Sequence, residues 1–187
     1  MSSHTNCAHD ATVLPSRRSV IVALVGAATL PAASPLFAAA DTPSSAEDER
    51  FMRMAIEEAR RADYPFGAVI VRDARLLARG RNLGRTNDDP TAHGEMVAIR
   101  RCLARHGSKA LKGATLYTSG EPCAMCMGAI LWSRFGRLVF AASVEQIASK
   151  MDQIMISSAE LAAKAPFVSI SITGGVLADE AVRLFAK

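Results

Sequence analysis

Two short stretches of sequence determine the expected fold: His93-Gly94-Glu95 and, after one further predicted strand, Pro122-Cys123-Ala124-Met125-Cys126. The two cysteines are three positions apart in the first turn of a predicted helix, so their sulfur atoms should share one face. One imidazole and two thiolates supply three ligands for a tetrahedral zinc and leave the fourth position open, as in catalytic zinc sites. The pattern therefore predicts a metal centre of the catalytic kind, held between the starts of two helices.

A structural zinc would need a fourth cysteine or histidine, and Cys102 is the alternative within the same region. Cys102 falls near the far end of the helix that begins around His93, roughly 13 Å along the helix axis. It is therefore not expected to reach the metal. Glu95 can be read either as an ordinary first-turn helix residue or, next to a metal, as a carboxylate that carries protons.

Outward from this pair of motifs, helical and strand patterns alternate after an initial hairpin. The predicted strands are 66–71, 76–79, 114–118, 138–142 and 168–173. The predicted helices are 46–61, 90–105, 122–134, two short ones within 146–164, and 179–185. This order predicts an α/β fold with three layers, in which helices flank a central mixed five-stranded sheet.

Several side chains receive a packing expectation. Met96, Ile99 and Leu103 are expected to face inward from the 90–105 helix, and Trp132 is expected in the core in preference to a pocket rim. Four methionines are expected to fill gaps around the cysteine-bearing helix. They are Met125, Met127, Met151 and Met155. For Glu121, which precedes Pro122, a structural and a functional role are equally open.

The segments 87–93 (Asn-Asp-Asp-Pro-Thr-Ala-His) and 117–123 (Tyr-Thr-Ser-Gly-Glu-Pro-Cys), together with the spacing of histidine, glutamate and Cys-x-x-Cys, carry a family resemblance. The chain resembles the cytidine/deoxycytidylate deaminase superfamily in its nucleoside deaminase branch. The resemblance implies a cytidine-deaminase-like fold, Zn²⁺ as cofactor, and hydrolytic deamination of a nucleobase or nucleoside with release of ammonia.

The same resemblance implies individual roles. His93, Cys123 and Cys126 would bind the metal, and Glu95 would be the catalytic proton carrier. Asn82 and Phe66 would bind the substrate, although a turn residue and a core aromatic are their plainer readings. The resemblance also implies a homodimer.

For the substrate, a guanine-type purine is favoured, because Thr118-Ser119 resembles the guanine deaminases and the basic terminal helix of the tRNA adenosine deaminases is missing. The segment 174–180 resembles the tRNA branch instead, and Tyr64 stands where a glycine is usual. Alternatives are a cytosine-type or tRNA-adenosine deaminase, or a non-catalytic zinc-stabilised base-binding module. The positive residues are dispersed along the chain, which predicts a small-molecule ligand and not a nucleic acid.

The first forty residues are expected to be an export signal. Arg17-Arg18 precede the apolar stretch 20–30, and Ala38-Ala39-Ala40 forms a small-residue cleavage site. Residues 1–40 are therefore predicted to be a leader of the twin-arginine type, with an ordinary secretory leader as the alternative. The deaminase domain is assigned to 41–187 and is expected to be periplasmic, without a membrane association of its own. Three cysteines remain in it, an odd number that does not indicate a disulfide framework.

Overall fold

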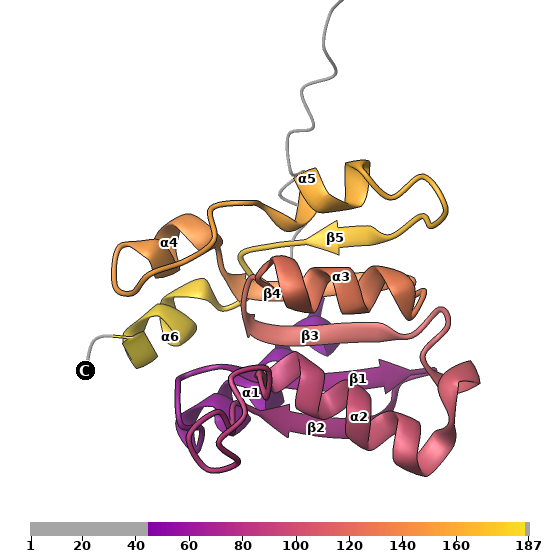
Figure 1. Cartoon of the computed structure of the whole chain (residues 1–187), viewed down its shortest axis with the longest axis horizontal. Coiled ribbons are helices and arrows are strands. Elements are labelled where there is room, and N and C mark those ends of the chain that lie inside the picture. Colours follow the sequence, from indigo (N-terminus) through magenta and orange to yellow (C-terminus); the bar gives the residue numbers. More distant parts are fainter. Residues whose placement is uncertain (1–44, 186–187) are drawn as a thin grey trace, which may run out of the picture. The chain divides into compact units, whose positions relative to one another are not determined.

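The computed structural model describes residues 45–185, so the predicted export signal lies outside the described residues. The five strands form one sheet in the order β2-β1-β3-β4-β5. Strand β1 is antiparallel to β2 and β3, whereas β3, β4 and β5 run parallel. The predicted mixed five-stranded sheet is confirmed (Figure 1). Within 45–185, no helix has the length and apolar character that crossing a membrane requires.

The strands are β1 (Gly67–Arg72), β2 (Arg75–Arg81), β3 (Thr115–Gly120), β4 (Arg137–Ala142) and β5 (Ser171–Thr173). The α-helices are α1 (Ala46–Arg60), α2 (Gly94–His106), α3 (Ala124–Trp132), α4 (Val144–Ala148), α5 (Ser158–Ala163) and α6 (Ala178–Val182). Two 3-10 helices, η1 (Ser108–Ala110) and η2 (Arg183–Phe185), complete the described elements.

Each face of the sheet has its own hydrophobic cluster, because successive strand residues point to opposite sides. On one face, Ile70, Leu116 and Leu138 pack against α2, α3 and α5. On the other face, Val69 and Val139 pack against α1, α4 and α6. Figure 1 shows α2 and α3 in front of the sheet and α1 behind it. The result is the predicted three-layer arrangement.

Two helices begin later than predicted. Helix α2 begins at Gly94 and not at Pro90, because the Asp89 carboxylate accepts hydrogen bonds from the backbone N–H and the hydroxyl of Thr91 at 2.8 and 2.6 Å. Such a side chain-to-backbone turn competes with a helix over the same residues. Helix α3 likewise begins after Cys123, which is its N-cap. His93 and Cys123 thus occupy matching positions, each immediately before a helix.

The inward face of α2 also differs from the prediction. Leu103 is exposed and Met96 only half-buried, while Ile99 is buried as expected. The buried face consists of Gly94, Glu95, Val97, Ala98, Ile99 and Cys102. Strand β5 is shorter than predicted, three residues instead of six.

A buried ion pair ties α1 to the middle of the sheet. Both nitrogens of the Arg137 guanidinium donate to the Asp48 carboxylate, at 2.7 and 2.9 Å, and the Tyr117 hydroxyl donates to the same carboxylate at 2.9 Å. Burial raises the pKa of Asp48, but the hydrogen bonds from Arg137 and Tyr117 outweigh it and leave the pKa below its ordinary value. Asp48 is therefore charged in the folded protein at neutral pH.

Asp48→Asn is expected to lower the free energy of unfolding at pH 7 by about 3 kcal/mol, at the low end for breaking a buried pair, because Arg137 keeps partial access to water. A depressed folded-state pKa stabilises above the unfolded pKa of about 3.9 and loses that contribution as the pH falls through the folded value. The difference between native and variant should shrink accordingly below pH ~4. Urea unfolding at several pH values measures it. A difference that stays constant over this range would contradict the assignment, and Glu57→Gln, on the exposed face of α1, serves as control.

Candidate metal centre and catalytic pocket

Three potential metal ligands converge where α2 and α3 begin. The Nδ1 atom of His93 lies 3.7 Å from the Cys123 sulfur and 3.6 Å from the Cys126 sulfur. All three donor atoms lie within 4.8 Å of one another. Zinc with bonds of about 2.3 Å to sulfur and 2.0–2.1 Å to nitrogen would place tetrahedral ligands roughly 3.6 Å apart. The spacing and the donor set therefore fit Zn²⁺.

Close backbone packing fixes the start of α2. A Cβ atom on Gly80 of β2 would collide with the carbonyl oxygen of Gly94 and with Ala98, and a Cβ on Gly94 would meet the carbonyl oxygen of Phe66 at 2.9 Å. Glycine is needed at both positions because the two backbones touch. This contact sets the height of His93 above the sheet.

The two cysteines share a proton between them. A hydrogen bond from the Cys126 thiol, together with one from His93, lowers the pKa of Cys123 to about 4. The same bond and burial raise the pKa of Cys126. At neutral pH the Cys123 sulfur is therefore a thiolate even without a bound metal. The thiolate is the form of cysteine that binds metal.

Glu95 lies beside these ligands and is almost completely buried from solvent. Its side chain is buried, and the Thr118 hydroxyl donates to its carboxylate at 3.4 Å. Burial raises the pKa of Glu95, and the neighbouring Cys123 thiolate raises it further. A carboxyl group with a raised pKa can both accept and return a proton, which general acid–base catalysis requires.

A cavity of about 440 Å³ opens above this centre. Of the six residues predicted for the site, His93, Glu95, Cys123, Asn82 and Phe66 line it, and Cys126 is buried next to His93. The structure therefore brings all six together. The remaining lining residues are Tyr64, Glu121, Met151, Asp152, Gln153 and Ile154.

Asn82 is placed both as a turn residue and as a residue of the cavity wall. Its side-chain oxygen accepts a hydrogen bond from the Gly84 backbone N–H at 3.0 Å, as expected of a turn residue. The amide nitrogen is left available to a ligand in the cavity, which Asn82 lines. Phe66 likewise does both, since it lines the cavity and packs edge-on against Phe185 at 5.2 Å between ring centroids.

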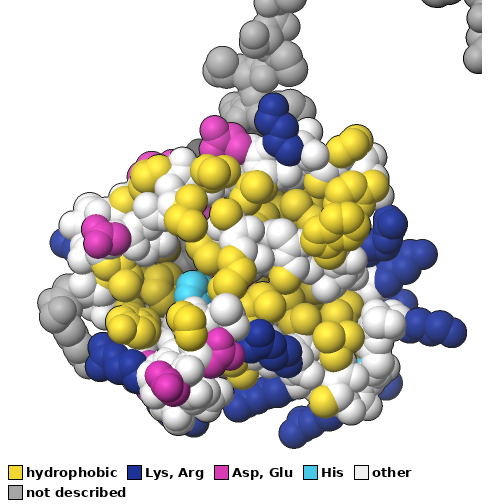
Figure 2. Space-filling view, viewed as in Figure 1, with side chains coloured by type: hydrophobic (Ala, Val, Ile, Leu, Met, Phe, Trp, Pro, Cys, Tyr) yellow, Lys and Arg dark blue, Asp and Glu magenta, His cyan; other side chains and the backbone are white. Residues whose placement is uncertain are grey.

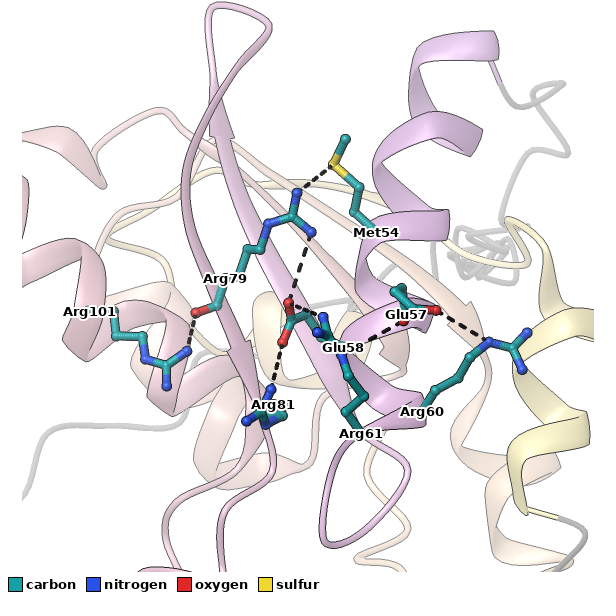
Figure 3. A network of polar contacts seen from close by, with 8 residues as sticks. All are labelled: Met54, Glu57, Glu58, Arg60, Arg61, Arg79, Arg81 and Arg101. Carbon is teal, nitrogen blue, oxygen red and sulfur yellow. Dashed lines mark hydrogen bonds and ion pairs between the residues drawn. The ribbon is translucent and has the colours of Figure 1, made fainter.

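A network of polar contacts joins α1 to β2 (Figure 3). The buried Glu58 carboxylate of α1 lies 3.0 Å from Arg61 and 3.7 Å from Arg81. Arg81 ends β2 and directly precedes Asn82. The end of α1 and the end of β2 therefore meet on this one carboxylate.

Glu121 has a structural role that the sequence left open. Its two carboxylate oxygens accept hydrogen bonds from the backbone N–H of Val144 at 3.0 Å and of Ser158 at 2.7 Å. These are the first residues of α4 and α5. Glu121 therefore holds the starts of α4 and α5, and Met151 and Asp152 of the segment between these helices line the cavity.

Asp152 is a pocket residue that sequence reasoning missed. It follows α4 in a stretch without periodicity, so only the fold shows that it faces the cavity. Two packing predictions are also corrected. Trp132 is 75% exposed and stacks on Phe167 at 4.7 Å, and Met125 is exposed as well, because α3 has only one covered face. Met155, in the segment between α4 and α5, is also exposed. Met127 is buried as predicted.

Comparison with known proteins agrees with this geometry. Residues 45–142 match the family model of the cytidine and deoxycytidylate deaminase zinc-binding region. The tRNA-specific adenosine deaminase of Haemophilus influenzae is 48% identical over 101 residues, which are 51% of this chain and 58% of that protein. The guanine deaminase of Bacillus subtilis is 50% identical over 78 residues, which are 42% of this chain and 50% of that protein. The chain thus spans between half and three-fifths of the length of these two curated relatives.

A solved structure from a study of tRNA:A34 deaminases superimposes with a TM-score of 0.63 and 33% identity, covering 72% of this chain and 98% of that one. The match to the family model includes His93, Glu95, Cys123 and Cys126, and it spans β1 to β4 of the sheet. The chain therefore belongs to the cytidine and deoxycytidylate deaminase zinc-binding family.

Proposed function

We propose that this protein is a zinc-dependent hydrolase that removes the amino group from a nucleobase or nucleoside and releases ammonia. One observation carries the proposal: a buried carboxylate, Glu95, lies in the same cavity as three ligands at zinc spacing. A purely structural metal would need neither an adjacent cavity nor a dry carboxylate with a raised pKa. The family relatives support the same reaction class.

The residues divide the chemistry as follows. His93, Cys123 and Cys126 would hold Zn²⁺, which when bound makes water a nucleophile at neutral pH. Glu95 takes one proton from the attacking water and delivers it to the ring nitrogen next to the amino-bearing carbon. It then takes the proton of the hydroxyl group newly bound to that carbon and delivers it to the departing amine. The water oxygen forms a bond to that carbon, the carbon–nitrogen bond breaks, and ammonia leaves. The Thr118 hydroxyl lies 3.4 Å from the Glu95 carboxylate and 3.0 Å from the carbonyl oxygen of Gly120, the nearer of its two acceptors.

The favoured substrate is a guanine-type purine, and Asp152 supports this choice. Guanine presents an N1–H donor next to the amino group that leaves, whereas adenine presents an acceptor at N1. Asp152 brings a carboxylate, which only accepts, to the rim of a cavity that also holds the Asn82 amide. The tRNA-adenosine reading remains the second candidate, because the relative in Haemophilus influenzae is a tRNA-specific adenosine deaminase.

Asp152→Asn is expected to lower kcat/KM for guanine by about 10²-fold, because loss of a charged hydrogen bond partner costs ~1.5–3 kcal/mol. Activity on a base that presents no paired donors should change far less. Ammonia release from guanine and from adenine, measured for both proteins, tests this. An equal loss on both bases would contradict recognition of the guanine donor edge by Asp152.

We also propose that the protein is a homodimer, as family habit implies. Hydrophobic side chains gather over α3 and its neighbours on one face (Figure 2). Among the exposed hydrophobic residues, Met125 and Trp132 belong to α3, and Phe167 stacks on Trp132. A stripe of this kind is unusual on an isolated surface and suits a second copy of the chain. Sedimentation should show a dimer that Trp132→Glu dissociates, and a native monomer at micromolar concentration would contradict the proposal.

Export by a twin-arginine route completes the proposal. It rests on Arg17-Arg18, the apolar stretch 20–30 and the alanines before residue 41. A route that carries folded proteins would let the cysteine pair bind zinc before it meets an oxidising compartment. Replacement of both arginines by lysine should retain the precursor inside the cell. Undiminished export of that variant, measured by fractionation, would indicate an ordinary secretory leader instead.

A further inference from the structure

A second cavity, of about 630 Å³, lies directly beside the catalytic pocket. The two cavities share Tyr64 and Met151 as lining residues. Phe185 lines the second cavity and contacts Phe66 of the first, with ring centroids 5.2 Å apart. A ligand seated over the metal centre therefore has adjoining space into which a substituent can extend.

Most of the charged residues that line this second cavity are cationic. Arg60, Arg85, Lys150 and Arg183 line it, against two carboxylates, Asp63 and Glu180. They come from the end of α1, the loop after β2, the segment after α4 and η2, so four separate parts of the chain converge there. Formally the lining carries an excess of two positive charges.

Both carboxylates already have partners. Asp63 accepts hydrogen bonds from the backbone N–H of Thr86 at 2.7 Å and from its hydroxyl at 2.9 Å. Glu180 lies 3.8 Å from Arg53, which is not a lining residue. These acids are thus engaged elsewhere and neutralise the cations of the cavity only in part.

Two of the four cations have no partner among the described residues, while Arg60 lies 3.8 Å from Glu57. Across residues 45–185, the side chains of Lys150 and Arg183 form neither a hydrogen bond nor an ion pair. The Arg85 guanidinium lies 4.6 Å above the ring of Tyr64, the residue that both cavities share. Unpaired cations in a concave site attract an anion, and guanidinium groups match phosphate oxygens in pairs.

The geometry points to a phosphate-binding annex: the second cavity binds a phosphate group carried by the same ligand whose base enters the zinc pocket. The inference rests on the proposed function and narrows it from a bare base to a nucleotide. The phosphate could belong to a free mononucleotide or to a guanosine within a short RNA, since the chemistry is the same. In either case the base would occupy the smaller cavity and the sugar phosphate the larger one.

The test is binding, measured by titration calorimetry on the zinc-loaded full-length protein with guanosine, guanosine monophosphate and a short RNA that contains one guanosine. The native protein should bind the monophosphate at least about tenfold more tightly than guanosine, which corresponds to ~1.4 kcal/mol. In Lys150→Ala/Arg183→Ala this ratio should fall to near one. Lys164→Ala/Arg105→Ala, which removes the same charge from exposed positions outside both cavities, should preserve the ratio.

The RNA arm identifies the source of the phosphate. RNA binding that exceeds monophosphate binding and depends on Lys150 and Arg183 would assign the annex to a polynucleotide, whereas weaker RNA binding would assign it to the mononucleotide. Equal affinity for guanosine and its monophosphate, or an equal loss in the two double variants, would overturn the annex. Because the readout is affinity, phosphate-dependent binding without ammonia release would refute the proposed deamination and leave the annex standing.

Discussion

Glu95→Gln is expected to abolish turnover while leaving the metal in place. The amide has nearly the size of the carboxylate and can still accept a hydrogen bond from Thr118, but it cannot carry a proton. A typical general acid–base contribution is ~10²–10⁴-fold, and the loss here should exceed it because one carboxylate serves several proton transfers. The measurement is kcat for ammonia release, with zinc content determined by atomic absorption on the same sample.

Asn82→Ala provides the contrast at the other side of the pocket. Asn82 lines the cavity and is proposed to contact the base and not the reacting carbon, so the change should raise KM more than it lowers kcat. Glu57→Gln, in an exposed ion pair on α1, controls for the loss of one carboxylate and should leave both constants unchanged. A Glu95→Gln protein that turns over at the native rate would exclude Glu95 as the proton carrier.

Removal of both cysteine ligands should give the second large effect. The native protein is expected to hold about one zinc per chain, and Cys123→Ala/Cys126→Ala to hold almost none. Binding that stabilises only the folded state contributes ~4 kcal/mol at a thousandfold excess over Kd, so thermal unfolding should shift down strongly as well. Metal analysis and calorimetry measure the two consequences separately.

Cys102→Ala is the matched control, because it removes a thiol that is fully buried but stands outside the metal cluster. It should cost some packing energy and keep the zinc. Full zinc retention in the double variant would show that the ligands have been assigned to the wrong residues.

The sequence predicted the parts of the fold that depend on local pattern. Alternating and helical periodicities predicted all five strands and the order of the helices. The Cys-x-x-Cys spacing predicted the cluster of potential metal ligands. Helix starts were less well predicted. The start of α2 depends on the Asp89 side chain competing for backbone groups near Thr91, which a proline-based rule does not register.

The rest of the site could not be predicted because it depends on contacts distant in sequence. Asp152 reaches the cavity only because Glu121 anchors α4 and α5 at their first residues. Trp132 is the aromatic residue of α3, yet its side chain is on the exposed face of the helix. Phe167, which comes later in the sequence, stacks on it there. Periodicity within one helix gives no information about which face the rest of the chain covers.

The most direct test of the central claim is ammonia release from the purified zinc-loaded protein incubated with a panel of bases and nucleosides. The panel should include guanine, adenine and cytosine, their nucleosides, and a tRNA with an adenosine in its anticodon. We predict ammonia from guanine-type substrates in proportion to zinc content. Binding of bases with no ammonia from any member of the panel would contradict the account and show that the chain is a zinc-stabilised binding module.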